Sequence, residues 1–445
     1  MSSAFLTDRY ELTMLAAALR DGTAERPSIF ELFSRRLSGG RRFGVVAGTG
    51  RLLALLREFR FGDDELRYLR DHDVVDATAL RYLEDYRFTG TIRGYREGEL
   101  YFPGSPILTV ESTFADAVVL ETLALSVLNH DSAVATAASR MSIAAGERPL
   151  AEMGSRRAAE QSAVAAARAA YIAGFAATSN LEAGRAWGIP TMGTAAHSWT
   201  LLHDSEEAAF RSQVESLGVE TTLLVDTYDI RNGVDTAIRV AGTGLGGVRL
   251  DSGDLPLVAA AVRAQLDELG ATDTNITVTS DLDEYAIAAL AASPVDFYGV
   301  GTSVVTGSGY PTAGMVYKLV ARQDPTGSWV SVAKASADKS SKGGRKAAFR
   351  TLRDGVAVAE TISVADGFEH VDTAAEHPDA RALQVVLVEG GEIDSAHEGA
   401  AGTAAARDHH LNVREELPVR ALALSKSDPA IPTTFVDAPE RPTGP

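Results

Sequence analysis

Apolar residues in the amino-terminal part of the chain follow both helical and extended spacing. They recur every three or four residues from about Tyr10 to Leu19 and from Leu52 to Phe59, which predicts two helices. From about Asp116 toward Ala145, a long alanine-rich stretch predicts further helix. Short extended runs bounded by turn residues predict strands at 29–33, 90–94 and 107–110.

The middle of the chain has a regular rhythm, in which short apolar runs end in small or polar residues and lead into helix-like segments. Seven such units, each of about 20 to 30 residues, predict a parallel sheet. We favour a barrel over a doubly wound open sheet, which has the same local pattern. In barrels the residues at the carboxyl ends of the strands face the active site. The seven endings are 152–155, 177–180, 192–194, 225–227, 250–253, 279–281 and 299–302.

The rhythm stops after about Leu319. Residues 334–350 are basic and rich in Ser and Gly, which is typical of a loop. The tail beyond Thr351 contains short β-like pieces such as 383–388. Residues 428–445 are rich in turn-forming residues, and we expect them to fray.

Composition and charge narrow the class of protein. Hydrophobic residues make up 45% and charged residues 23%, as in an ordinary globular protein. The chain has no cysteine, which excludes disulfides, thiolate metal sites and cysteine nucleophiles and fits a reducing compartment. A net charge of −18 repels nucleic acid and anionic membranes. No apolar run approaches the roughly 20 residues that span a bilayer, and the first residues lack a signal-peptide pattern. We therefore expect a cytoplasmic protein whose site for an anion is a local basic island.

His197 is the histidine with the most suggestive surroundings. It follows residues 192–196, where small side chains let a ligand approach the backbone closely. A neutral imidazole there would serve as a nucleophile or a general base near pH 7. A structural or solvated histidine is the alternative interpretation.

A second candidate is the turn at residues 251–254, Asp-Ser-Gly-Asp, at another strand ending. Asp251 and Asp254 could bind Mg²⁺ through water, hydrogen-bond ribose hydroxyls, or cap the following helix, and Asp254 is well placed as a helix cap. Arg249 lies two residues before Asp251 and therefore points to the same face of the strand. An Arg/Asp pair aimed into a barrel mouth indicates a functional site.

Three further parts of the chain contain residues that could bind a ligand. Glycine, serine and threonine at 299–303 and 306–309 can cradle a phosphate, although such residues also make ordinary turns. Arg156, beside a strand ending, suits a carboxylate or a solvated helix face. Residues 242–247 match G-x-G-x-x-G, but a strand-like run follows the glycines where a dinucleotide site requires a helix. We interpret them as a loop that enters a strand.

Eight segments, taken in order, resemble nicotinate phosphoribosyltransferases. The resemblance covers nearly the whole chain and thins after about Arg350. One departure is Met153, which stands where the family often has a ring-stacking aromatic residue before Gly-Ser-Arg; methionine can still pack on an aromatic face. The segments are 7–14 (TDRYELTM), 30–36 (FELFSRR), 154–157 (GSRR), 193–199 (GTAAHSW), 225–229 (VDTYD), 248–255 (VRLDSGDL), 280–284 (SDLDE) and 299–302 (GVGT).

The resemblance implies an α/β fold with two parts. An incomplete, TIM-like α/β barrel at 114–333 would form the catalytic domain. A smaller α/β domain at 1–113 would be completed by the carboxyl-terminal segment 334–445, which begins with the basic loop.

The resemblance also implies a reaction. Nicotinate and 5-phosphoribosyl-1-pyrophosphate would give nicotinate mononucleotide and pyrophosphate, with coupled hydrolysis of ATP, in the biosynthesis or salvage of NAD. His197 would be phosphorylated by ATP, and Asp251 and Asp254 would stabilise positive charge that develops on the ribose. Mg²⁺ would arrive on the pyrophosphate and ATP, with no metal site of the protein itself.

Residue roles follow from the same resemblance. Tyr10 would stack on the pyridine ring of a neighbouring subunit, so that a homodimer would share its active sites. Arg156 and Arg249 would lie beside nicotinate. The remaining implied contacts are Met153, Ser179, Ser252 and Gly253 with the substrate, and Arg35, Ser280, Gly299, Gly301, Thr302, Lys334, Lys339 and Arg345 with phosphates.

Two rival functions stay open at this point. Nicotinamide phosphoribosyltransferases share the scaffold but place an aspartate at the position of Ser179, where it would repel the carboxylate of nicotinate. Ser179, with Arg156 nearby, favours nicotinate over nicotinamide as the substrate. A catalytically silent binding protein on the same fold is the second rival, and the intact His197, Arg249 and Asp251 speak against it.

Overall fold

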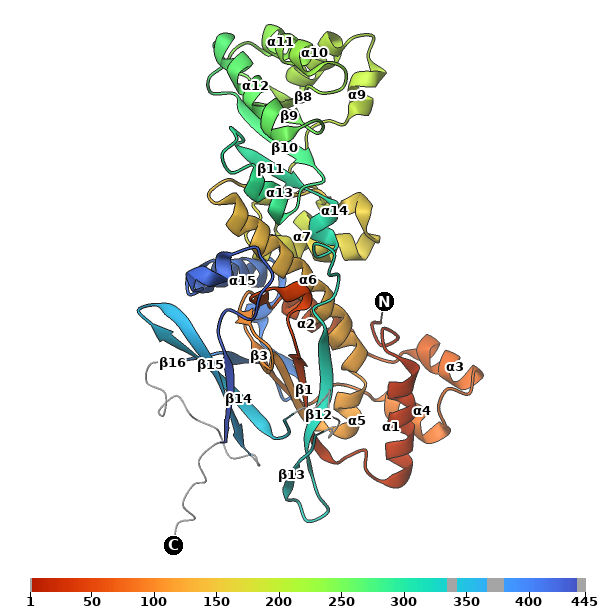
Figure 1. Ribbon diagram of the computed structural model, residues 1–445. Helices are drawn as coiled ribbons and strands as arrows, with labels where there is room; N and C mark the ends of the chain where they lie inside the picture. The colour runs from red at the N-terminus through yellow and green to blue at the C-terminus, as the bar shows by residue number, and fades with distance from the viewer. Residues whose placement is uncertain (1, 334–341, 366–379, 438–445) are drawn as a thin grey trace. The chain divides into compact units, whose positions relative to one another are not determined.

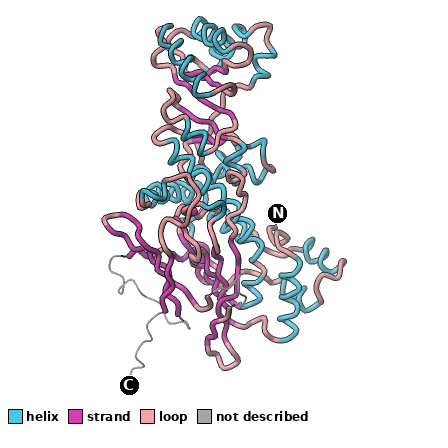
Figure 2. Tube along the Cα trace, viewed as in Figure 1, coloured by secondary structure: helices cyan, strands magenta, loops and turns pink. Residues whose placement is uncertain are grey.

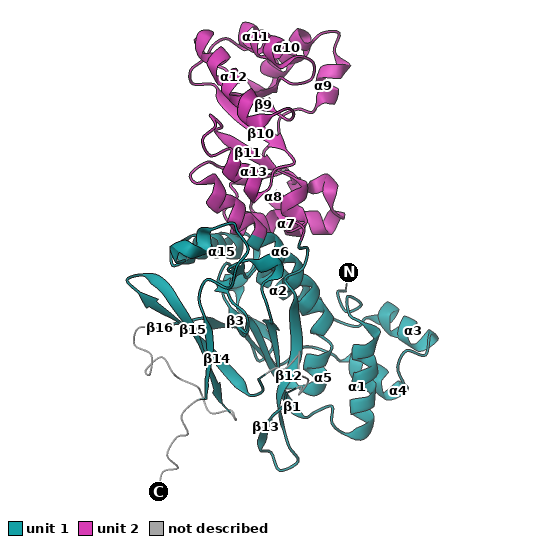
Figure 3. Cartoon of the chain, viewed as in Figure 1, with its two compact units in different colours: residues 1–136, 310–445 teal, residues 137–309 magenta. Residues whose placement is uncertain are grey.

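The computed structural model describes residues 2–333, 342–365 and 380–437, which belong to two compact units (Figure 3). The first unit comprises Met1–Thr136 and Tyr310–Pro445, and the second comprises Ala137–Gly309. The boundaries expected from the sequence lay at 113/114 and 333/334. The boundaries between the units lie elsewhere, because the first unit extends past residue 113 into the long helix α6 (Glu121–Ala145), which spans the boundary at 136/137, and because β12 (Met315–Gln323) pairs with β1 (Pro27–Ser34) of the first unit.

An antiparallel sheet of seven strands forms the frame of the first unit (Figure 1). Its strand order is β13-β12-β1-β5-β3-β17-β18, so three strands from the amino-terminal part of the chain are flanked on both sides by strands from its later part. The predicted strands at 29–33, 90–94, 107–110 and 383–388 are confirmed as β1, β3, β5 and β17. The bounds of the other six strands are β12 as above, β13 Trp329–Ser331, β5 Leu108–Thr113, β3 Thr91–Tyr95, β17 Gln384–Glu389 and β18 Glu392–Ile393.

Helices of the first unit bury apolar faces against this sheet. The predicted helices at 10–19 and 52–59 are confirmed as α1 and α2, and Leu12 and Leu15 of α1 are fully or nearly fully buried. They join a core that includes Phe30 and Leu32 of β1 and Val110 of β5. The helices are α1 Arg9–Asp21, η1 Ser38–Gly40, α2 Thr49–Arg57, α3 Asp63–Asp71, α4 Ala77–Glu84, α5 Phe114–Val118, α6, η3 Ser395–His397, α15 Gly399–Arg414 and η4 Val419–Leu422.

The last part of the basic segment expected as a loop, residues 345–350, belongs to a mostly buried strand. Arg345–Arg353 forms β14, in a sheet ordered β16-β14-β15-β19 with Ala380–Ala382, Val356–Ala365 and Thr433–Asp437 as its other strands. Its cations are neutralised inside the unit, because Arg345 pairs with Glu111 and Lys346 with Glu31. The loop prediction was therefore wrong for 345–350, and the predicted fraying was wrong for β19. The short pair β2 (Gly44–Val45) and β4 (Leu100–Tyr101) completes the unit.

Glu11 is an unusual residue of α1, because its carboxyl is fully buried without a cation beside it. It accepts hydrogen bonds from Thr7 Oγ1, from the backbone N–H of Thr122 at 2.9 Å, and from the Thr122 hydroxyl. Burial raises the pKa of Glu11 from 4.5 to about 7 against these hydrogen bonds. The negative charge of Glu121 also raises the pKa of Glu11. Tyr10 is a second titratable neighbour, whose own pKa is raised by burial and in part by the charge of Glu11.

We expect the folded protein to lose stability as the pH rises through the ionisation of Glu11. The unfolded chain ionises this carboxyl near pH 4.5 and the folded chain near pH 7. The higher pKa in the folded state stabilises the folded protein by about 3 kcal/mol. This stabilisation is fully present below pH 4.5 and is lost as the pH rises through about 7. Urea unfolding of the wild type and of Glu11→Gln at pH 5 and pH 7.5 measures it: relative to the variant, the wild type gains roughly 2 to 3 kcal/mol at the lower pH.

The comparison with Glu11→Gln separates the effect of this carboxyl from that of His410, whose contribution to stability changes with pH in the opposite direction. Burial lowers the pKa of His410 to about 4, so its contribution is lost as the pH falls from 6.5 toward 4. His410 is present in both proteins and cancels in their difference. A difference in unfolding free energy that stays constant between the two pH values contradicts the prediction.

The second unit confirms the parallel sheet expected from the β-then-α rhythm. Figure 2 shows strands and helices following one another along the trace of this unit. Its six strands are ordered β7-β6-β11-β10-β9-β8, and every ladder between them is parallel. One isolated parallel bridge joins Thr178 to Thr191, where the third strand was expected. The strands are β6 Leu150–Glu152, β7 Ala177–Thr178, β8 Thr222–Leu224, β9 Gly247–Leu250, β10 Asn275–Ser280 and β11 Phe297–Val300.

Helices follow the strands of the second unit in alternation, as the sequence pattern predicts. The glycines at 242–247 connect the end of α11 to β9, so they form a loop that enters a strand and do not start a helix. Within the described residues, no helix combines the length and apolarity needed to cross a membrane. The helices are η2 Ser155–Arg157, α7 Glu160–Ile172, α8 Leu181–Trp187, α9 His197–Leu202, α10 Glu206–Leu217, α11 Ile230–Ala241, α12 Leu255–Glu268, α13 Glu284–Ala289 and α14 Thr302–Val305.

Candidate active site

A cavity of about 230 Å³ opens at the carboxyl ends of four neighbouring strands of the second unit. The strands β6, β11, β10 and β9 all point the same way, so their last residues meet at one edge of the sheet. Eight residues predicted from the sequence line the cavity: Met153, Arg156, Arg249, Asp251, Ser280, Gly299, Gly301 and Thr302. The other three lining residues are Arg157, Thr279 and Asp281.

Arg249 and Asp251 are joined through a third residue. Arg249 Nε donates to the hydroxyl of Thr279 at 2.8 Å, and that hydroxyl donates to Asp251 Oδ1. The direct separation of Arg249 Nη2 and Asp251 Oδ1 is 3.5 Å, at the limit of a hydrogen bond. The guanidinium therefore keeps donor capacity for an anionic ligand in the cavity.

His197 lies beside the same turn, as expected from the sequence. It is the first residue of α9, and its imidazole is 41% exposed. Its Nε2 is 3.8 Å from Asp251 Oδ2 and 3.9 Å from Asp226 Oδ1, and its Nδ1 is 3.1 Å from the Thr227 hydroxyl. Two carboxylates around Nε2 favour a proton on that nitrogen, which leaves the lone pair on Nδ1.

Asp226 is a site residue that the sequence reasoning did not single out. Its side chain is 1% exposed, and its Oδ2 accepts from the Asp251 backbone N–H at 2.8 Å and from the Ser252 hydroxyl at 2.7 Å. Its Oδ1 is buried and has no hydrogen-bond partner among the described residues. The signal available in the sequence was its place at a strand ending, in Val-Asp-Thr.

The turn after β9 has a structural task as well as its place beside the cavity. Asp254 Oδ1 accepts from the Leu257 backbone N–H at 3.4 Å and caps α12, as the alternative interpretation held. Gly253 has φ +90°, a conformation that L side chains rarely adopt. Ser252 is engaged with Asp226. The turn thus fixes the backbone that carries Asp251.

Glycines at the end of β11 make room for the floor of the cavity. A Cβ at Gly299 would lie 2.5 Å from Thr279 Cγ2 and 2.7 Å from Met153 Sδ, closer than real side-chain contacts. Gly301 leaves its space beside the Met153 backbone. Met153 therefore packs across Gly299, at the position where the family often has an aromatic residue.

A buried carboxyl holds the neighbouring strand ends together. Glu152, at the end of β6, accepts from the Thr178 hydroxyl at 2.6 Å and from the Gly154 backbone N–H. Burial raises its pKa above the ordinary value of a glutamic acid. Ser179 follows directly, is exposed, and donates its backbone N–H to the Glu152 carbonyl at 2.8 Å, but it does not line the cavity.

The remaining predicted residues belong to the first unit or lie outside the described residues. Tyr10 is 46% exposed on α1, and the buried Nε of Arg35 has no hydrogen-bond partner among the described residues. Arg345 donates to both oxygens of Glu111, at 2.9 and 3.2 Å. Lys334 and Lys339 lie outside the described residues. The roles of all five stay predictions.

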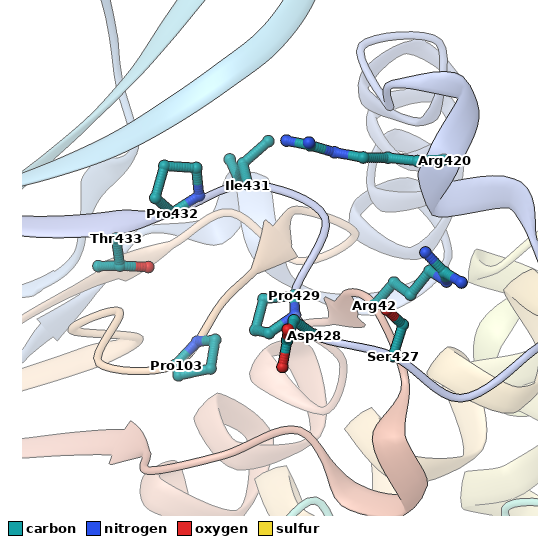
Figure 4. Close-up of a pocket in the computed structure, with 9 residues that line it drawn as sticks. All are labelled: Arg42, Pro103, Arg420, Ser427, Asp428, Pro429, Ile431, Pro432 and Thr433. Atoms are coloured by element: carbon teal, nitrogen blue, oxygen red, sulfur yellow. The ribbon is translucent and has the colours of Figure 1, made fainter.

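The first unit has a cavity of its own, of about 590 Å³ (Figure 4). Arg42, Arg420 and the segment 427–433 line it together with Pro103. None of the predicted site residues is among its lining residues. Within the described residues, no three His, Cys, Asp or Glu side chains are grouped to hold a metal ion.

Comparisons with known proteins agree on one family. The model of the nicotinate phosphoribosyltransferase (NAPRTase) N-terminal domain matches residues 5–129. A nicotinate phosphoribosyltransferase of Mycobacterium tuberculosis is 54% identical over 443 residues, covering 97% of this chain and 95% of that protein. The Bacillus subtilis protein of the same name is 40% identical, covering 78% of this chain and 72% of its own.

Solved structures agree with this chain over nearly its whole length. Human nicotinic acid phosphoribosyltransferase aligns with a TM-score of 0.78 at 26% identity and covers 97% of both chains. A nicotinate-nucleotide pyrophosphorylase from Pyrococcus furiosus aligns with a TM-score of 0.74 at 22% identity, covering 93% of this chain and 95% of its own, which shows a shared fold.

Proposed function

Because the chain belongs to the nicotinate phosphoribosyltransferase family, we propose that it joins nicotinate to 5-phosphoribosyl-1-pyrophosphate and couples this transfer to hydrolysis of ATP. The products are nicotinate mononucleotide and pyrophosphate, on the route to NAD. The observation that carries the proposal is the strand-end cavity, which Arg249 and Asp251 line, together with His197, whose Nε2 lies 3.8 Å from Asp251 Oδ2. The family's solved relatives give the same fold at 26% identity.

The ribosyl transfer needs charge stabilisation more than proton transfer. The ring nitrogen of nicotinate carries a lone pair, which forms the bond to C1 of the ribose while the bond from C1 to the pyrophosphate oxygen breaks. The electron pair of that bond leaves with pyrophosphate. Asp251 would stabilise the positive charge on the ribose, and Arg249 and Arg156 would hold the carboxylate of nicotinate.

The coupling to ATP would pass through His197. The lone pair on Nδ1 attacks the γ-phosphorus, and the bond to the leaving oxygen breaks to release ADP. Water later takes the phosphoryl group as inorganic phosphate. Thr227, 3.1 Å from Nδ1, would orient the ring, and Asp226 and Asp251 would keep the proton on Nε2.

Mg²⁺ suits the site as an ion carried by its substrates. Mg²⁺ retains water and phosphate ligands and needs only one or two carboxylates from a protein. Asp251, with a side chain 29% exposed, would hold it. When bound, Mg²⁺ neutralises charge on the leaving pyrophosphate.

We also infer three features of the molecule that follow from the family. The parallel sheet corresponds to an α/β barrel interrupted between Thr191 and β8, because β6 and β11, the first and last strands of the sheet along the chain, pair with each other.

A homodimer with shared active sites is supported by Tyr10 and Met14, which lie four residues apart and are exposed on α1. We expect the protein in the cytoplasm, consistent with its lack of cysteine.

The preference for nicotinate tests the function directly. Purified protein is expected to form nicotinate mononucleotide faster with ATP than without it, and to use nicotinate in preference to nicotinamide. The family resemblance places Ser179 beside nicotinate, so Ser179→Asp would bring a carboxylate close to that of the substrate. At about 4 Å and an effective dielectric near 20 the repulsion would be roughly 4 kcal/mol, close to a thousandfold in nicotinate affinity. The measurement is kcat/KM for both substrates.

Ser179→Asn is the matched control, because it has the size of aspartate without the charge. We expect it to retain most of the nicotinate affinity. Faster turnover of nicotinamide than of nicotinate by the wild type would overturn the proposed function. Equal losses in the asparagine and aspartate variants would assign the effect of Ser179 to size and not to charge.

A further inference from the structure

Thr279, which had no predicted role, occupies the centre of the hydrogen bonds at the cavity. It lies near the end of β10 and is 4% exposed. Its hydroxyl accepts from Arg249 Nε at 2.8 Å and donates to Asp251 Oδ1. A guanidinium can only donate, so the single proton of the hydroxyl is directed to the carboxylate. One side chain thus fixes the separation of the cation and the anion.

The orientation of this hydroxyl is set by packing. Thr279 is the ladder partner of Gly299 on β11. Its methyl group occupies the space that the missing Cβ of Gly299 leaves, where a Cβ would lie only 2.5 Å away. Threonine is stiff about χ1, so a confined methyl group also fixes the hydroxyl. The position of the bridge is therefore built into the pairing of β10 and β11.

The bridge belongs to a connected network that reaches His197 by two routes. Asp251 uses Oδ1 toward Thr279, while its Oδ2 lies 3.8 Å from His197 Nε2. Arg249 Nη1 also donates to the Ala195 carbonyl at 3.3 Å and to the Thr194 hydroxyl at 3.4 Å, just before His197 in the chain. In the first route, the uncharged Thr279 hydroxyl connects the two charged side chains, Arg249 and Asp251, and is hydrogen-bonded to both.

We propose that Thr279 is a positioning residue that couples the phosphorylation state of His197 to the affinity of the Arg249 site for the pyridine carboxylate. The proposal rests on the proposed function. A phosphoryl group on Nδ1 adds roughly −1.5 to −2 of charge to the ring whose other nitrogen, Nε2, lies 3.8 Å from Asp251 Oδ2, and this charge repels the carboxylate. Because Thr279 holds that carboxylate at a fixed distance from Arg249, the displacement is passed to the guanidinium that binds nicotinate.

The test compares the KM for nicotinate with and without ATP, together with kcat, in the wild type, Thr279→Val and Thr279→Ser. Valine has nearly the same shape as threonine but removes both hydrogen bonds, whereas serine retains the hydroxyl. We expect the wild type to bind nicotinate more tightly with ATP, within the range of about 5- to 150-fold typical of coupled sites. In Thr279→Val the ratio of the two KM values falls toward one, because only the Arg249 Nη1 contacts with Thr194 and Ala195 and the 3.5 Å approach of Arg249 to Asp251 remain. In Thr279→Ser we expect most of the wild-type ratio to return.

Phosphorylation of His197 is followed in parallel with γ-³²P-ATP, because the hydrogen bonds of the Thr279 hydroxyl go to Arg249 and Asp251. Labelling is expected to persist in both variants. Coupling between two sites is reciprocal, so nicotinate should also raise the labelled fraction of the wild type and leave that of Thr279→Val unchanged. Thr279→Ala, which introduces no second methyl group, provides the same comparison if the valine variant does not fold.

The outcomes separate this proposal from the function on which it rests. If Thr279→Val retains the wild-type ratio of KM values, Thr279 does not carry the coupling. If the wild type forms nicotinate mononucleotide but binds nicotinate equally with and without ATP, there is no coupling to carry. If the wild type forms no nicotinate mononucleotide, the proposed function itself fails.

Discussion

Replacement of His197 by alanine is expected to abolish the transfer of phosphate from ATP to the protein and the stimulation of nicotinate mononucleotide synthesis by ATP. The imidazole is 41% exposed, with Nδ1 beside the Thr227 hydroxyl and Nε2 between two carboxylates, so it is the nucleophile that the site offers to a phosphate. Labelling with γ-³²P-ATP should give an acid-labile, base-stable phosphate in the wild type and none in the variant. The phosphate is expected on Nδ1, which NMR of the phosphoprotein distinguishes from Nε2.

His203→Ala is the matched control for His197→Ala. His203 lies in the same unit, and its ring contacts Trp199 and bonds to the Trp199 carbonyl at 2.8 Å, so its role is structural. This variant should retain both the label and the ATP stimulation. Label that survives in His197→Ala would contradict the assignment. An unlabelled, inactive wild type would instead favour the rival of a silent binding protein.

Replacement of Arg350 by methionine is expected to lower the free energy of unfolding by about 3 to 5 kcal/mol. Arg350 is fully buried and donates to Glu99 at 2.7 Å, to Glu360 at 2.6 Å and to the Leu100 carbonyl at 2.8 Å. Burial disfavours the ionised form of Glu99, but Arg350 and hydrogen bonds from His409 and Arg381 hold its pKa well below the ordinary value. Methionine fills the volume but leaves carboxylates buried without their shared cation.

Urea unfolding of the two proteins measures this loss. Lys342→Met is the control, because Lys342 forms an exposed ion pair with Asp437 at 2.8 Å. Such pairs contribute roughly 0 to 1 kcal/mol, so this variant should unfold almost as the wild type does. A loss in Arg350→Met no greater than that in Lys342→Met would contradict the prediction.

The cavity could be located from the sequence because its main signals are local. Parallel strands bring their carboxyl ends to one edge, so the endings after β6, β9, β10 and β11 had to meet there. Arg249 and Asp251 are two residues apart and therefore share a face of β9. Gly253, with φ +90°, and Asp254, which caps α12, are also recognisable from their neighbours in the chain. These features need no knowledge of distant contacts.

The partners of buried polar groups depend on contacts between distant parts of the chain. Asp226 and Thr279 occur at strand endings like many others, and only the sheet order places them against Asp251. The basic run suggested a loop because charge usually indicates exposure, but Arg345 finds Glu111 and Arg350 finds Glu99 more than 200 residues away. Spacing along the chain determines which face a side chain occupies. Only tertiary packing decides which charges meet there, because the desolvation of a buried charge is offset by a partner whose position the local sequence does not specify.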